Sequence, residues 1–213
     1  MFALSEWREA ALEPKIEVSG LRIRRAQRSD ARSLAALIEI AGDGIPSYLW
    51  SQVAKPGETP LDVGEQRAER EKGGFSYRHA TVAEREREVI GMILAYRLPD
   101  ASDEDRGALA DLPEFLRPFV ELEFEVSGSF YINALAVHAP HRSQGIGARL
   151  LRKAEGQAIE AGCHRMSVQH FLRNQRAGAF YRRYGFRFAG ERVLLPHPAY
   201  PHEDRSILLV HDI

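Results

Sequence analysis

The sequence contains a single cysteine, Cys163, among its 213 residues. One cysteine excludes a disulfide framework within the chain and favours a reducing compartment. Charges at Glu6, Arg8 and Glu9 stand where a secretion signal needs its apolar core, and no apolar run of about 18 residues follows that could form a membrane span. We therefore expect a cytoplasmic protein that has no membrane partner.

An excess of either charge is also missing, because 29 basic residues face 30 acidic ones and the charged stretches mix both signs. Proteins that bind nucleic acid usually carry a basic face, so we expect no nucleic-acid partner and a small molecule or peptide instead. The chain is 44% apolar and long enough for one sizeable core. We expect an N-terminal extension over 1–19 and one domain over 20–213.

Apolar periodicity predicts a chain that mixes strands with helices. Strands are expected over 21–27, 75–84, 88–98, 120–126, 130–137, 165–170, 186–195 and 205–212, and helices over 30–41, 61–73, 145–161 and 174–184. Two stretches interrupt this pattern, a turn-rich loop at 42–60 and an acidic, proline-containing excursion at 98–118 that has room for a short helix. The strand–helix–strand unit over 130–170 should form a right-handed parallel crossover, whereas the hairpins are antiparallel. The fold class is therefore α/β, with a central mixed, mostly antiparallel sheet and flanking helices.

A glycine loop, "RSQGIGA" (142–148), joins the strand over 130–137 to the next helix. It does not match the dinucleotide-binding fingerprint, whose third glycine would fall at Leu150, and it lacks the Gly-Lys-Ser/Thr of a P-loop. Glycines ahead of a helix can serve a tight turn or let backbone N–H groups surround a phosphate. The loop by itself leaves both interpretations open.

A second motif, "NQRAGAFYRRYGF" (174–186), follows about thirty residues later. Together the two motifs resemble those of the Gcn5-related N-acetyltransferases, the GNAT family. The resemblance is specific over 119–190 and extends more weakly, through the order of elements, to 21–118. It implies the GNAT acyl-CoA N-acyltransferase fold, acetyl-CoA as cosubstrate and no metal.

The resemblance also assigns residues to acetyl-CoA. N–H groups from Gln144 to Ala148 would hold the pyrophosphate, the strand edge at 135–137 would bind the pantetheine arm, and the Val137 N–H would stabilise the oxyanion. Asn174 is first a helix cap and only then a ligand. The expected contacts are Leu135, Ala136, Val137, Arg142, Ser143, Gln144, Gly145, Ile146, Gly147, Ala148, Asn174, Ala177, Phe180 and Tyr181.

Two catalytic residues are expected on the same basis. Tyr181 stands where the family keeps a tyrosine that protonates the departing thiolate, although its spacing also suits a core aromatic. Some relatives place a glutamate base on one of the two central strands, but the corresponding positions here are Tyr131 and Gln169. We name Glu123 as the base, while noting that Glu121, Glu123 and Glu125 also fit the solvated face of a strand.

The segments 42–60 and 98–118 are expected to lie on the acceptor side, with Tyr48 and Trp50 contacting the substrate. The implied function is transfer of an acetyl group to a primary amine of a small molecule or peptide. The alternative is a module that binds or senses acyl-CoA without catalysis. The resemblance is compatible with a homodimer. Because His138-x-x-His141 lacks further ligands at zinc spacing, no metal site is expected.

Overall fold

The computed structural model describes residues 20–198 and 204–213, so the expected N-terminal extension over 1–19 lies outside the described residues. In this part of the chain a seven-stranded sheet has the order β1-β2-β3-β4-β5-β7-β6. Its strands are β1 (Arg22–Arg25), β2 (Ala80–Arg85), β3 (Glu88–Arg97), β4 (Phe130–Val137), β5 (Arg165–Phe171), β6 (Arg187–Leu194) and β7 (Asp204–Asp212). The β4–β5 pair is parallel and the others are antiparallel, which confirms the predicted sheet.

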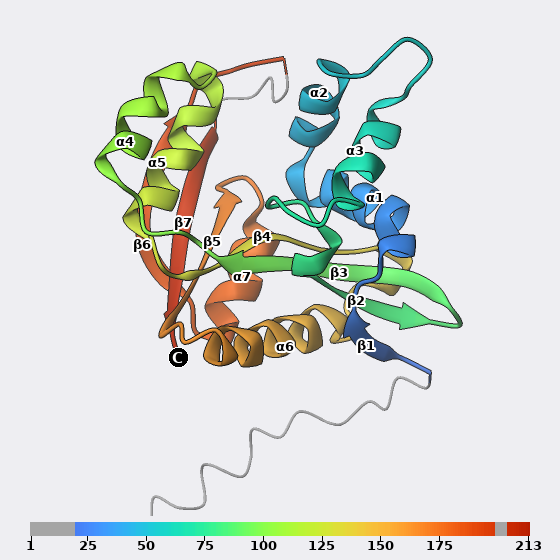
Figure 1. Ribbon diagram of the computed structural model, residues 1–213. Helices are drawn as coiled ribbons and strands as arrows, with labels where there is room; N and C mark the ends of the chain where they lie inside the picture. The colour runs from blue at the N-terminus through green and yellow to red at the C-terminus, as the bar shows by residue number, and fades with distance from the viewer. Residues whose placement is uncertain (1–19, 199–203) are drawn as a thin grey trace, which may run out of the picture.

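Helices cover both faces of the sheet (Figure 1). They are α1 (Ala31–Gly42), α2 (Ile45–Ser51), α3 (Pro60–Ala68), α4 (Asp103–Gly107), α5 (Arg117–Glu125), α6 (Ile146–Glu160) and α7 (Gln175–Tyr184). One core cluster joins α6 and α7 to one face of the sheet, and a second joins α1, α2 and α3 to the other. Helix α5 covers that other face farther along, where Leu122 packs with Tyr131 and Leu208. The sheet is therefore buried on both sides.

The predicted crossover is present as β4, α6 and β5. Gly145 precedes α6 with a φ of 74°, a left-handed conformation that glycine adopts without strain. Helix α7 begins with the predicted cap, since the Asn174 side chain accepts a hydrogen bond from the Ala177 N–H at 3.1 Å. It ends at Gly185, whose φ is 108°. Local signals were sufficient for these boundaries.

The expected strand over 120–126 is wrong, because these residues form most of helix α5. An alternation of seven residues also places Leu122 and Val126 four positions apart on one side of a helix, and both are buried. Pro118 suits the first turn of a helix, where its missing N–H is not needed. Elsewhere, β2 begins at Ala80 rather than 75, because Tyr77–His79 form a 3₁₀ turn.

The segment 42–60 is likewise less irregular than expected, because it contains helix α2. Trp50 lies on this helix and is 2% exposed in the core beneath α1 and α3. A Cβ atom on Gly64 of α3 would lie 2.5 Å from the Trp50 ring, so the ring fits against bare backbone. The structure thus corrects the expectation that Trp50 contacts a substrate: its indole fills the core.

We predict that Trp50→Ala destabilises the fold by about 3–5 kcal/mol, as is typical when a large aromatic side chain is removed from a core. Val53→Ala is the control, because Val53 is 54% exposed and its truncation should change the free energy of unfolding by less than about 0.5 kcal/mol. Denaturant unfolding measures both. A Trp50→Ala protein of wild-type stability would contradict this placement.

Candidate active site

Strands β4 and β5 run side by side for a short distance and then part. In the described chain their ladder joins Phe130–Ile132 to Met166–Val168. Beyond it β4 continues to Val137 and β5 to Phe171 without pairing to each other. Strand edges present rows of N–H and C=O groups that need partners. The gap between the two strands is therefore suited to an extended ligand that pairs with the backbone.

The direction of the β4 backbone identifies the groups that face this gap. The His138 N–H donates to the Ile90 carbonyl of β3 at 3.0 Å. Since backbone groups alternate between the two edges of a strand, the N–H groups of Leu135 and Val137 point away from β3 and into the gap. The N–H group of Ala136 points toward β3 and belongs to the β3–β4 ladder. Of the three expected contacts on β4, Leu135 and Val137 are thus placed to offer backbone to a ligand.

A β-bulge lies at the point where the strands part. Ala134 pairs with Leu94 and Ile132 with Ala95, so Asn133 is an extra residue on β4. The Asn133 amide donates to the Tyr96 hydroxyl at 3.4 Å. Bulges re-aim side chains, and this one occurs at the apex of the gap.

The loop between β4 and α6 presents backbone N–H groups at a helix N-terminus. Ser143 and Gly145 both have positive φ, 63° and 74°. The Arg142 Nε donates to the Val137 carbonyl at 2.9 Å and so folds the loop back against the end of β4. Arg176 of α7 donates to the Ser143 hydroxyl at 3.1 Å. The loop is held from both sides in a conformation that can receive an anion.

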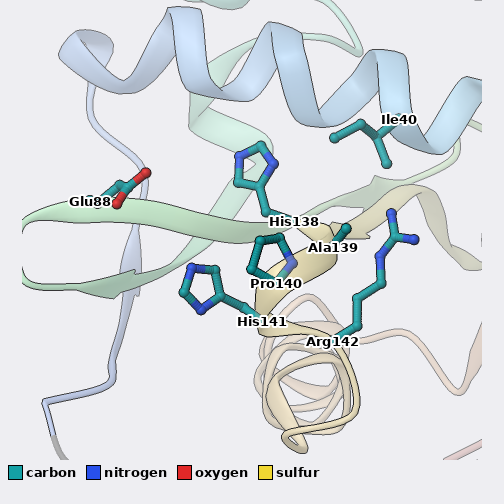
Figure 2. Close-up of a pocket in the computed structure, with 7 residues that line it drawn as sticks. All are labelled: Ile40, Glu88, His138, Ala139, Pro140, His141 and Arg142. Carbon is teal, nitrogen blue, oxygen red and sulfur yellow. The ribbon is translucent and has the colours of Figure 1, made fainter.

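Strand β2 also contributes to this loop. Arg85 donates to the Gln144 side-chain oxygen at 3.0 Å, and the Gln144 amide donates to the Pro140 carbonyl at 3.2 Å. Figure 2 shows the adjoining pocket of about 560 Å³. It is lined by Ile40, Glu88, His138, Ala139, Pro140, His141 and Arg142. This side of the loop therefore carries one arginine and one glutamate, together with two imidazoles.

Helix α7 packs under the loop and carries three of the expected contacts, Ala177, Phe180 and Tyr181. The Phe180 ring lies 3.5 Å from the position that a Cβ on Gly147 would take. Tyr181 is 5% exposed, and its ring meets those of Phe180 and Phe186. Burial raises the pKa of the Tyr181 hydroxyl, which has no hydrogen-bond partner among the described residues. It therefore stays protonated at physiological pH and can donate.

Glu123 enters the site from α5, on the face of the sheet opposite to α6. Its carboxyl is partly buried, and the loss of water raises its pKa to about 7, while a hydrogen bond with Tyr131 acts in the other direction. Tyr131 is buried on β4, next to Tyr96, and its own pKa is raised by burial and by Glu123. The carboxylate that β4 itself does not carry is thus brought to β4 by another element.

The two excursions meet near the end of β6. The Tyr48 ring of α2 packs edge-on against Phe115 and His197, with centroids 5.9 and 4.9 Å away, while Phe115 and His197 stack at 3.9 Å. Phe119 and Phe171 join the same partly buried cluster. Tyr48 is thus brought together with the second excursion, whereas Trp50 is not.

Sequence reasoning missed Tyr131 and Tyr96 as companions of Glu123. The sequence marks Tyr131 only as a position without the glutamate that some relatives carry, and nothing local shows that its hydroxyl meets a side chain of α5. Over residues 20–198 and 204–213 no cluster of three or more His, Cys, Asp or Glu side chains could hold a metal ion. None of the helices described here is both long enough and apolar enough to cross a membrane.

Comparison with solved structures finds the same fold in several proteins. An N-acetyltransferase from Staphylococcus aureus Mu50 is 23% identical, with 89% of this chain and 100% of that one covered at a TM-score of 0.62. The Drosophila melanogaster polyamine N-acetyltransferase is 14% identical over 91% and 100% of the two chains, with a TM-score of 0.64. The Brucella melitensis ribosomal-protein-alanine N-acetyltransferase is 19% identical over 90% and 99%, with a TM-score of 0.58. At these identities the likeness shows a shared fold.

The family itself follows from the sequence. No curated protein matches the chain significantly. The model of the acetyltransferase (GNAT) family matches residues 50–186, more than half of the chain, including the loop and α7. This chain therefore belongs to the GNAT acetyltransferase family.

Proposed function

We propose that this protein transfers the acetyl group of acetyl-CoA to a primary amine. The observation that carries the proposal is the gap between β4 and β5, with the glycine loop of 142–148 at its open end and a carboxylate and a tyrosine hydroxyl near its apex. The domain boundaries 20–213 are part of the proposal. The Drosophila and Brucella relatives are named for a polyamine and for a ribosomal-protein alanine, so small amines and peptide N-termini are both reasonable acceptors.

Acetyl-CoA would lie along the β4 edge. The N–H groups of the loop over 142–148, assisted by the dipole of α6, would bind the pyrophosphate. The pantetheine arm would pair with Leu135 and Val137 as an added strand does, which places the thioester near the bulge. Asn174, which caps α7, and Ala177 and Phe180 of that helix would lie beside this path.

Glu123 would act as the base. An aliphatic amine is mostly protonated at neutral pH and must lose a proton before its lone pair can attack the thioester carbonyl. A carboxylate whose pKa is about 7 is ionised in half or more of the molecules at pH 7 or above, and it binds the proton more strongly than an ordinary glutamate does. The Val137 N–H would stabilise the tetrahedral oxyanion.

Collapse of that intermediate breaks the C–S bond and releases the coenzyme A thiolate, which must gain a proton. Tyr181 would donate a hydrogen bond to the sulfur or transfer its proton to it. Because burial raises the pKa of Tyr181 above 10, this group should add no alkaline limb to the rate profile within the usual assay range. Tyr48 would border the acceptor.

A screen of amines tests the function directly. Small mono- and polyamines and short peptides with free N-termini are offered with acetyl-CoA, and thiol release is recorded together with the mass of the acetylated product. Product formation with any of these amines supports the enzyme. Tight binding of acetyl-CoA without acetyl transfer to any amine would favour the sensing module instead.

Gly147→Val should weaken CoA binding about 100-fold, the equivalent of roughly 2.7 kcal/mol, because a branched side chain would crowd the phosphate loop. Gly156→Val is a matched control on the same helix, where an added Cβ meets nothing within 4 Å. Titration calorimetry with CoA compares the two folded variants. Equal affinities would show that the loop is not the phosphate site.

Glu123→Gln should lower kcat about 10²- to 10⁴-fold, the range typical of a lost general base. In the wild type, kcat/KM should rise with pH through about 7, because Glu123 must be ionised to accept a proton. The variant should lack this limb. Glu104→Gln replaces an exposed carboxylate in the same excursion and should retain both rate and profile. A wild-type profile in Glu123→Gln would assign the base elsewhere.

Tyr181→Phe retains the ring and its packing but removes the hydroxyl. We expect kcat to fall about 10²-fold, near the lower end for a group that assists the leaving thiolate, while CoA affinity and stability stay within about twofold and 1 kcal/mol. Steady-state kinetics and calorimetry measure these values. If kcat is retained within about twofold, Tyr181 is a packing residue.

A further inference from the structure

The outer face of α5 carries two carboxylates that share a single arginine. Arg192 of β6 pairs through its Nε with Glu121 at 2.8 Å and through its terminal nitrogen with Glu125 at 2.5 Å. The three side chains are 37–39% exposed. An arginine that pairs with carboxylates at two positions of one helix restricts rotation of the helix about its axis.

Helix geometry connects this pairing to Glu123. Residues four apart lie nearly above one another on a helix, whereas a residue two positions from each lies about 160° away. Glu121 and Glu125 therefore share the face that meets Arg192, and Glu123 occupies the opposite one. With the outer pair held by β6, Glu123 faces Tyr131.

Strand β6 is shaped to receive α5 at this point. A Cβ on Gly190 would lie 2.9 Å from a Glu125 carboxylate oxygen and 3.5 Å from Leu122, so the absent side chain lets the helix approach closely. The β6–β7 register shifts between Phe188 and Gly190. A second tie lies at the other end of the helix, where the Gln169 amide of β5 donates to the Phe119 carbonyl at 2.9 Å.

Helix α5 needs such ties because it is short. A helix of nine residues is not stable alone in water, so its orientation depends on tertiary contacts. Exposed ion pairs add little to overall stability. The larger consequence of the Arg192 pairing is the orientation that it gives to the side of α5 that carries Glu123.

We propose that Arg192 is a positioning residue for Glu123: by pairing with Glu121 and Glu125 it orients α5 so that the Glu123 carboxylate reaches the site of amine deprotonation. The inference rests on the proposed function. It adds to it a residue on the outermost strand that touches neither the acceptor nor acetyl-CoA.

A double-mutant cycle tests it with Arg192→Met, Glu123→Gln and the double variant. Arg192→Met keeps most of the side-chain stem but removes the fork, and kcat should fall about 10- to 100-fold, because small misplacements of a reacting group have effects of this size. In the Glu123→Gln background the same change should alter kcat less than about twofold. Arg205→Met is the matched control: it breaks the Arg205–Glu191 pair between β6 and β7 without touching α5, and it should retain wild-type kcat.

The Glu121→Gln/Glu125→Gln variant removes the same contacts from the helix side, and it replaces Arg192→Met if that protein does not fold. An equal loss of kcat in both backgrounds would mean general damage and would overturn the proposal, as would wild-type kcat in Arg192→Met. Failure of the proposed function itself would be distinguishable from these outcomes. In that case the wild type acetylates no amine, or Glu123→Gln alone retains full activity.

Discussion

Backbone amides that lack a neighbouring strand are the constraint on which the rest of this structure depends. The β4–β5 ladder ends at Ile132 and Val168, and the N–H groups of Leu135 and Val137 then face an open gap. Closing the gap with protein would satisfy these groups but would remove the place that we propose for the pantetheine arm. The bulge at Asn133, the loop after β4 and the capped α7 are all arranged around this parting of two strands.

The excursion between β3 and β4 supplies a carboxylate, a group that the central strands β4 and β5 lack. β4 carries Tyr131 where the family resemblance led us to look for a carboxylate, and α5 brings Glu123 against that tyrosine. Burial then raises the pKa of this carboxyl to about 7, into a range that an exposed glutamate does not reach.

The cofactor side of the fold was predictable because its signals are local. The strand–loop–helix order, the Asn174 cap and the terminating Gly185 each lie within a few residues of the structure they specify. Helix α5 was not predictable, because a seven-residue alternation suits a strand and a helix equally. Its orientation also depends on Arg192, which lies 71 residues from Glu121 in the sequence. The burial of Trp50 likewise depends on Gly64, whose missing side chain has no meaning until α2 and α3 are packed together.

The short β4–β5 ladder also divides the sheet into two parts. Within the described chain β3 and β4 share seven residue pairs, whereas β4 and β5 share three, reinforced by the buried hydroxyls of Ser129 and Ser167 at 2.6 Å. The β4–β5 junction thus divides the sheet into two leaves, β1–β4 and β5–β7, and the core cluster beside α6 continues across both. The loop of 142–148 follows the first leaf, and β6, which pairs with α5, belongs to the second. A ligand that paired with the Leu135 and Val137 N–H groups would lie along this division and would contact elements carried by both leaves.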